Sequence, residues 1–175
     1  MRPARLAAVR RSIRSVADFP KKGIVFRDIT PLLSDGGQFR DCVRHFKQLA
    51  KGRVDRVISI ESRGFILGSA LACELGVGFV PIRKQGKLPH RTFQAAYDLE
   101  YGTAVMEVHC DGIARGARVV IVDDVLATGG TAKAAVDLVR KCGARITGVY
   151  FLIELEALGG RRKLKGLPVH SLIKF

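Results

Sequence analysis

The sequence has no tryptophan, few aromatic residues and no long apolar run. None of its apolar stretches approaches the ~20 residues that an α-helix needs to cross a bilayer, so no membrane-spanning helix is expected. The amino-terminal segment is basic but has no continuous apolar core followed by a small-residue cleavage site, which argues against a secretory signal. We therefore expect no membrane partner.

Cysteine and histidine are scarce and scattered, with four of each. No two cysteines have the CxxC spacing, so neither a zinc site nor a disulfide framework is predicted. We expect free thiols and a cytoplasmic protein, since the cytoplasm keeps thiols reduced.

Acidic residues are also scarce: 16 Asp and Glu stand against 30 Lys and Arg, for a net charge of +14. Such a charge favours anionic partners. The basic residues gather in 1–22 and in RRKLK at 161–165, without any RNA-binding aromatic motif or zinc finger. Solvated basic surfaces and a contact with a polyanion both remain open, and nucleic acid is not the expected partner.

Periodicity in the 175 residues predicts one α/β domain with a largely parallel sheet. Leu6, Val9, Ile13 and Val16 share one helical face, which favours an amphipathic helix over the alternative, a transit peptide. A loop is expected at 18–33, and 83–102 is polar, without a clear period and long enough to be a lid. The other helices are predicted at 38–50, 64–76 and 131–143, and the strands at 54–60, 77–82, 103–109, 117–123, 146–154 and, as a possible last strand, 168–175.

The stretch VVIVDDVLATGGT at 119–131 combines a buried strand, two acids and a glycine-rich turn. Ligands of parallel sheets bind at the carboxyl ends of the strands, where Asp123 and Asp124 are expected. Small residues and a helix N-terminus after them can cradle a phosphate, while the carboxylates suit sugar hydroxyls or a metal. A P-loop and a dinucleotide fingerprint are excluded because their glycine and lysine spacings are absent. A plain capped turn would explain neither acid.

This stretch resembles the phosphoribosyl-pyrophosphate motif of the type I phosphoribosyltransferases. Four further stretches are similar, in order and spacing, to the adenine phosphoribosyltransferase family: GIVFRDIT (23–30), ESRGF (61–65), RKQGKLP (83–89) and YDLEYG (97–102). The resemblance implies the type I fold in a single domain, 1–175. It would have an N-terminal hood with the adenine loop at 1–33 and a mobile lid at 83–109.

The resemblance also implies an activity in purine salvage. Adenine and phosphoribosyl pyrophosphate would give AMP and pyrophosphate. Mg²⁺ would be held through substrate and water near Asp123 and Asp124. The protein would be a homodimer. Those two carboxylates would bind the ribose hydroxyls and favour the cationic transition state. Phosphate would bind at Ala127, Thr128, Gly129, Gly130 and Thr131, and pyrophosphate at Arg63, Arg83, Lys84 and Lys87. Arg63 would also be a catalytic residue, through its contact with the leaving group.

Adenine would be read by the main chain of Val25 and Arg27, with Phe26 stacking on its face and Leu155 closing the other. In the lid, Glu100 is the expected general acid/base near the purine N7, and Tyr101 would cover the ribose. The lid of this chain is bulkier and more basic than the resemblance leads one to expect. Two other functions stay open: a phosphoribosyl-pyrophosphate-sensing regulator that binds nucleic acid, and a transferase for another base.

Overall fold

The computed structural model describes residues 1–50, 52, 54–98 and 103–175, in two compact units that are treated separately. Met1–His45 form the first unit and Phe46–Phe175 the second. The boundary falls within one helix, α3 (Gly36–Leu49). The division into a hood, a main domain and a lid stays a prediction.

The first unit contains a hairpin where no strand was predicted. Its elements are α1 (Pro3–Arg11), β1 (Arg14–Ala17), β2 (Val25–Asp28), α2 (Thr30–Ser34) and most of α3. The predicted amphipathic helix ends at Arg11, and the expected loop at 18–33 contains β2 and α2. The prediction was wrong here because β1 and β2 pair antiparallel and so satisfy each other's backbone groups, an interaction between segments that periodicity cannot detect.

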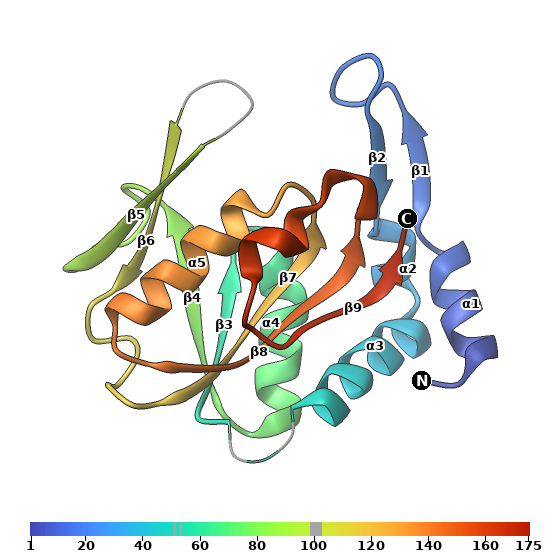
Figure 1. Ribbon diagram of the computed structural model, residues 1–175. Helices are drawn as coiled ribbons and strands as arrows, with labels where there is room; N and C mark the ends of the chain where they lie inside the picture. Colours follow the sequence, from blue (N-terminus) through green and yellow to red (C-terminus); the bar gives the residue numbers. More distant parts are fainter. Residues whose placement is uncertain (51, 53, 99–102) are drawn as a thin grey trace. The chain divides into compact units, whose positions relative to one another are not determined.

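The second unit is built on a seven-stranded sheet in the order β5-β6-β4-β3-β7-β8-β9 (Figure 1). The strands from β4 to β9 in this order are parallel, whereas β6 pairs antiparallel with both β4 and the edge strand β5. The prediction of a largely parallel α/β sheet is therefore confirmed. The strand bounds are β3 (Arg56–Ile60), β4 (Gly78–Lys84), β5 (Thr92–Asp98), β6 (Thr103–His109), β7 (Arg118–Leu126), β8 (Arg145–Glu154) and β9 (Val169–Lys174).

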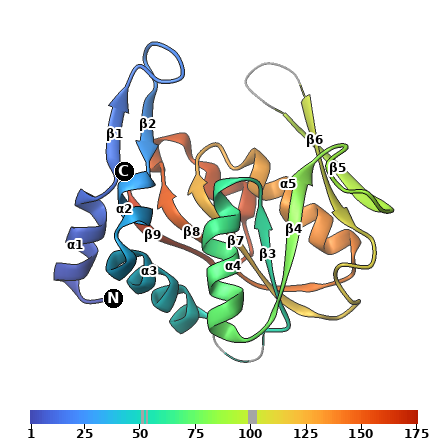
Figure 2. The ribbon, with the colours of Figure 1, turned by 180° about the vertical axis from the view of Figure 1, so that it is seen from behind.

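Helices α4 (Arg63–Leu75) and α5 (Gly130–Lys141) cover opposite faces of this sheet (Figures 1 and 2). The first approaches β3 closely, since a Cβ on Gly68 would lie 2.6 Å from the Cβ of Ser59. The Ser59 hydroxyl is buried and lies 2.7 Å from the carbonyl oxygen of Gly64 and 2.6 Å from that of Val122. It thereby ties the start of α4 to β3 and β7.

Two predictions for this unit were wrong in extent. The expected irregular segment 83–102 contains β5, which pairs with β6 along its full length from Thr92 opposite His109 to Asp98 opposite Thr103. β7 continues three residues beyond its predicted end, because its pairing with β8 persists to Leu126 opposite Glu154. Both aspartates of the central motif consequently lie inside a strand.

The chain after β8 is held by an ion pair between the buried Glu154 and the half-exposed Arg161. Two 3₁₀ turns, Glu156–Leu158 and Gly160–Leu164, lead to β9, the predicted last strand. The Arg161 guanidinium donates from Nε to Glu154 Oε1 (2.9 Å) and from Nη2 to Oε2 (2.5 Å), and from Nη1 to the carbonyl oxygen of Val169 (2.8 Å). These bonds hold the pKa of the Glu154 carboxyl below its usual range.

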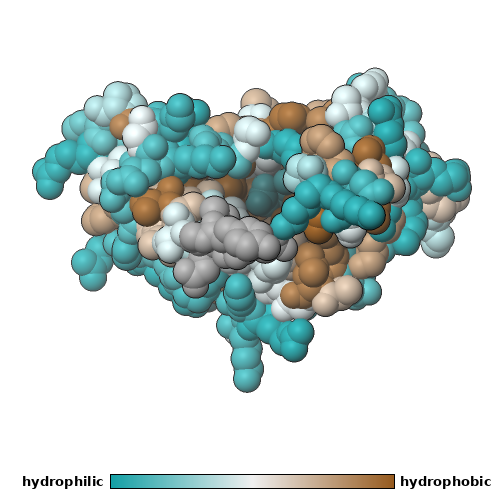
Figure 3. All heavy atoms as spheres, turned by 90° about the horizontal axis from the view of Figure 1, so that it is seen from above, coloured by the Kyte–Doolittle hydropathy of each residue, from teal (hydrophilic) through white to brown (hydrophobic). Residues whose placement is uncertain are grey.

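Polar residues dominate the exposed surface, and hydrophilic side chains cover much of the face drawn in Figure 3. The apolar core of the second unit lies between its sheet and helices and includes Ile58, Ile121, Leu138 and Phe151. None of the helices in the described parts of the chain is long and apolar enough to span a bilayer.

Replacing Arg161 with methionine should destabilise the protein in a pH-dependent way. A carboxyl whose folded-state pKa is lowered stabilises the fold above its unfolded-state pKa, and this contribution is lost as the pH falls through the lowered value. We expect a loss of about 1–2 kcal/mol at pH 7, because the arginine is partly solvated. The difference from wild type should shrink below about pH 4.5, where an unfolded glutamate becomes protonated.

Urea unfolding of the Arg161→Met variant between pH 4 and pH 8 measures this change. Lys163→Met, at an exposed position of the same 3₁₀ turn, is the matched control. A difference between Arg161→Met and wild type that stayed constant over this pH range would contradict the assignment.

Candidate active site

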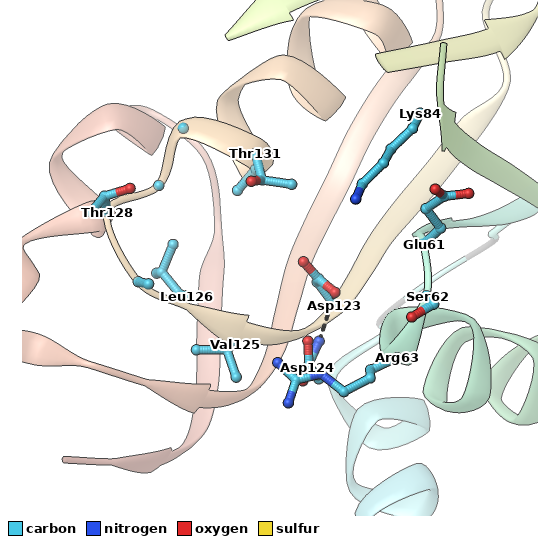
Figure 4. Close-up of a pocket in the computed structure, with 14 residues that line it drawn as sticks. Glu61, Ser62, Arg63, Lys84, Asp123, Asp124, Val125, Leu126, Thr128 and Thr131 are labelled. Carbon is cyan, nitrogen blue, oxygen red and sulfur yellow. Dashed lines mark hydrogen bonds and ion pairs between the residues drawn. The ribbon is translucent and has the colours of Figure 1, made fainter. Parts of the chain in front are cut away.

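A cavity of about 430 Å³ opens at the carboxyl ends of the central strands (Figure 4). It lies where β3, β4 and β7 end and where α5 begins, the position that parallel sheets generally use for ligands. Its lining consists of Glu61, Ser62, Arg63, Lys84 and residues 123–132. Segments predicted separately from the sequence therefore meet in one place.

Asp123 and Asp124 point in different directions, as neighbours on a strand must. Asp123 is turned into the cavity, and the Nζ end of Lys84 is directed toward it (Figure 4). Asp124 Oδ2 lies 2.8 Å from Arg63 Nε, and its backbone N–H donates to Asp123 Oδ1 at 2.9 Å. The two acids thus have different surroundings: Asp123 faces the cavity, and Asp124 forms an ion pair with Arg63 of α4.

Burial raises the pKa of both carboxyls, since Asp123 is 8% and Asp124 5% exposed. For Asp123 the neighbouring charge of Asp124 raises the pKa further. For Asp124 the Arg63 guanidinium opposes the effect of burial. A cationic or hydroxyl-bearing ligand in the cavity would be attracted to this pair, and it would favour the ionised form of Asp123.

Gly64, the second residue of α4, makes room for the pair. A Cβ at this position would lie 2.6 Å from Asp123 Oδ1 and 3.3 Å from the Asp123 Cα. Neither contact is sterically acceptable without a shift of the β7 backbone or of the carboxylate. The glycine in ESRGF is therefore required by the geometry of the acids.

The loop from Ala127 to Thr131 lines the cavity on the side opposite Lys84 (Figure 4). Gly129 has a φ of +78°, and α5 begins directly after it, so the free N–H groups of a helix start face the same space. A Cβ on Gly129 would lie 2.5 Å from the carbonyl oxygen of Gly160. This glycine therefore allows the loop to pack against another backbone segment.

The basic residues of the RKQGKLP stretch occupy different positions. Lys84 lines the cavity, whereas Arg83 and Lys87 are absent from its lining. Arg83 Nε donates to Glu61 Oε2 at 2.7 Å, and its Nη1 donates to the carbonyl oxygen of Lys87 at 3.2 Å. The pyrophosphate roles predicted for Arg83 and Lys87 stay predictions.

The predicted adenine-binding residues are divided between the two units. Val25, Phe26 and Arg27 form part of β2 in the first unit, where the Phe26 ring packs edge-to-face on Phe19 at 5.2 Å. Leu155 follows β8 in the second unit and is absent from the cavity lining. Glu100 and Tyr101 lie outside the described residues.

Sequence reasoning missed three residues that shape the site: Ser59, Glu61 and Gly160. Glu61 was quoted only as part of a motif, yet it lines the cavity and pairs with Arg83. A Cβ on Gly160 would lie 2.2 Å from the Ala127 carbonyl oxygen, so this glycine is needed under the loop. Ser59 could have been found as the one polar residue inside the apolar run VISI, because a buried hydroxyl needs a hydrogen-bond partner.

The residues present fit a magnesium ion that is held mainly by water and by substrate phosphates. Within the described parts of the chain, no group of three or more His, Cys, Asp or Glu side chains is placed to hold a metal ion. Asp123 and Asp124 nevertheless place carboxylate oxygens at the cavity, and Mg²⁺ commonly keeps several waters while it contacts one or two carboxylates and substrate phosphates.

Comparison with known proteins identifies the family. Residues 40–168 match the model of the phosphoribosyl transferase domain. The chain is 56% identical, over 178 aligned positions, to an adenine phosphoribosyltransferase of Methylobacterium nodulans, covering all of this chain and 98% of the relative. The chain belongs to the adenine phosphoribosyltransferase family.

Solved structures of this family have the same fold. The crystal structure of the Thermoanaerobacter pseudethanolicus adenine phosphoribosyltransferase has a TM-score of 0.94 at 48% identity, covering 97% of this chain and 99% of that one. The Saccharomyces cerevisiae adenine phosphoribosyltransferase, solved with an imino-altritol bisphosphate and adenine, has a TM-score of 0.92 at 39% identity, covering 97% and 98%. The predicted type I phosphoribosyltransferase fold is thus confirmed.

Replacing Gly64 with alanine should impair phosphoribosyl transfer while the fold is retained. The new Cβ would displace the Asp123 carboxylate, for which we expect a catalytic role. Because small displacements of a catalytic group are costly, we expect kcat/KM to fall about tenfold or more. Gly36→Ala is the control, because a Cβ there meets no atom within 4 Å. Equal activity of the two variants would show that the site tolerates the shift.

The acid limb of the pH–rate profile should report the buried pair. Replacing Asp124 with asparagine removes the charge that raises the pKa of Asp123, so Asp123 should ionise at lower pH. We expect the limb of kcat/KM for phosphoribosyl pyrophosphate to move to lower pH, at a reduced maximal rate. Asp137→Asn, in the exposed pair with Lys133, should leave the limb in place. Movement of the Asp124→Asn limb to higher pH would refute this reading.

Proposed function

We infer that this chain transfers the phosphoribosyl group of phosphoribosyl pyrophosphate to adenine, giving AMP and pyrophosphate in purine salvage. One observation carries the inference beyond family membership. Two buried carboxylates, for which Gly64 leaves space, line the same cavity as a helix N-terminus and two basic side chains, Arg63 and Lys84. This combination suits a ribose that carries a phosphate at one end and pyrophosphate at the other.

The substrate's phosphates bind at opposite sides of the cavity in this proposal. The 5′-phosphate lies on the backbone N–H groups and hydroxyls of 127–131, at the start of α5, where the helix dipole favours an anion. The pyrophosphate faces Arg63 and Lys84, with Arg83 at the end of β4 and Lys87 in the loop after it as further partners. Between these anchors the ribose is fixed over Asp123.

The chemistry takes place at C1′. The bond from C1′ to the pyrophosphate oxygen breaks and its electron pair leaves with pyrophosphate. The lone pair of adenine N9 forms the new bond to C1′, and the proton on N7 passes to the proposed base, Glu100. Positive charge develops on the ribose ring, so the ionised carboxylates of Asp123 and Asp124 stabilise the transition state electrostatically while they accept bonds from the ribose hydroxyls. Both substrates are held in register, which lowers the entropic part of the barrier.

Mg²⁺ is the proposed cofactor, held by substrate oxygens and waters near Asp123 and Asp124. When bound, it supplies positive charge that neutralises the pyrophosphate leaving group. The protein's own part is to orient the ribose and to exclude water from the reacting carbon.

Adenine recognition is assigned to residues 23–30, which include β2. The main-chain groups of Val25 and Arg27 would read the edge of the base, with Phe26 and Leu155 on its two faces. Glu100 is the proposed general acid/base at N7 and Tyr101 the ribose cover, both within the lid. A 6-oxopurine would present an acceptor where adenine presents a donor, so it should bind less well.

A homodimer in the cytoplasm is the proposed working form. The four cysteines are free, in keeping with a reducing compartment. Ile66 on α4 is a large apolar side chain that is 42% exposed, and a second copy of the chain could cover it. Sedimentation equilibrium would decide between monomer and dimer.

One assay tests the function. The protein is incubated with Mg²⁺, phosphoribosyl pyrophosphate and, in turn, adenine, hypoxanthine, guanine or orotate, and nucleotide is measured. We expect AMP from adenine and much slower turnover of the other bases, with Asp123→Asn as the inactive control. Product from another base in preference to adenine would reassign the substrate, and no product from any base would favour the sensor.

A further inference from the structure

Glu107 is a buried acid for which the reaction has no direct use. It lies in β6 and is 3% exposed. In the sheet it stands between Arg83 of β4 and Gln94 of β5, its register partners on the two sides. An ionised carboxylate at such a position must be compensated by hydrogen bonds, because burial of an unsatisfied charge is costly.

Backbone N–H groups provide this compensation. The N–H groups of Lys87 and Leu88 both donate to Glu107 Oε1, each at 3.0 Å, and Thr92 Oγ1 lies 3.4 Å from Oε2. One carboxylate oxygen therefore holds two successive peptide groups of the loop that joins β4 to β5. Such an arrangement fixes the course of a loop much as a capping residue fixes a helix end.

Arg83 holds the carbonyl group of Lys87, whose N–H group is bonded to Glu107. Its Nη1 donates to the carbonyl oxygen of Lys87 (3.2 Å), while its Nε is bonded to Glu61, which lines the cavity. The N–H and the C=O of Lys87 are thus both bonded to buried or half-buried charged groups. The Lys87 side chain itself is exposed, and the preceding Gly86 turns the chain with a φ of +79°.

We propose that Glu107 is a positioning residue for pyrophosphate. Its carboxylate holds the backbone of Lys87 and Leu88, so that the basic side chains of this loop are presented toward the leaving group, and it does not touch the substrate. The inference rests on the pyrophosphate role proposed for Lys84 and Lys87. It predicts that loss of the accepting oxygen of residue 107 weakens the binding of phosphoribosyl pyrophosphate and pyrophosphate and leaves the binding of adenine unchanged.

The test compares Glu107→Ala and Glu107→Gln with wild type in steady-state kinetics. For alanine we expect the KM for phosphoribosyl pyrophosphate to rise about tenfold, because the loop is released. The KM for adenine should stay within about twofold. Glutamine keeps an oxygen that accepts N–H bonds and should restore most of the loss. Glu74→Ala, at an exposed acid of α4, is the control.

Coupling to Lys87 separates positioning from general destabilisation. If Glu107 acts through Lys87, the double variant Glu107→Ala/Lys87→Ala should be little worse than Lys87→Ala alone. Additive losses would overturn the proposal. So would an unchanged KM for phosphoribosyl pyrophosphate in Glu107→Ala, or an equal rise in both KM values.

Two measurements remain decisive if a variant fails to fold or the enzyme assay fails. Amide hydrogen exchange on ligand-free wild type should show protection at Lys87 and Leu88, and rapid exchange at both would overturn the proposal. Calorimetric titration with pyrophosphate and Mg²⁺, of wild type and of Glu107→Gln or Glu107→Ala, measures the affinity for pyrophosphate in the absence of adenine. Weaker binding by the alanine variant alongside an inactive wild type would refute only the transferase function.

Discussion

The burial of two adjacent carboxylates at the end of β7 is the constraint on which the site depends. Two like charges in a strand interior are unfavourable, and burial raises the pKa of both. The arrangement is tolerable because Arg63 lies 2.8 Å from one carboxylate and the other faces a cavity that can receive a cationic or hydroxyl-bearing ligand. In the proposed reaction, the developing positive charge of the substrate would meet Asp123, and the free energy of that interaction would be available to catalysis.

Close backbone contacts build the rest of the site around this pair. Gly64 leaves space for Asp123, and Gly129 and Gly160 let the loop from Ala127 to Thr131 pack against the turn after β8. That turn is in turn secured by the bonds from Arg161 to Glu154. These contacts fix the backbone around the cavity, and such preorganisation is what the proposed transfer to C1′ requires.

Much of the second unit could be predicted from periodicity, because the apolar runs at 54–60, 117–123 and 146–154 are typical of buried parallel strands. The failures have a common cause. β1 and β2, which pair with each other, and β5, which pairs with the correctly predicted β6, were missed because their short sequences show no clear period. Their stability comes from cross-strand bonds, which no single segment reveals. The same holds for Glu107, whose partners lie in a loop 19 and 20 residues away.

The sequence by itself determined the order of most elements, the motif at 119–131 for which phosphate binding is proposed and, through four further motifs, the family. Local patterns suffice for these because they depend on residues that are neighbours along the chain. The tertiary structure alone decided which charges meet: Arg63 with Asp124, Arg83 with Glu61, and Glu107 with the loop at Lys87 and Leu88. Such pairings depend on the register of strands and on how closely a helix approaches a sheet, and these are set by packing.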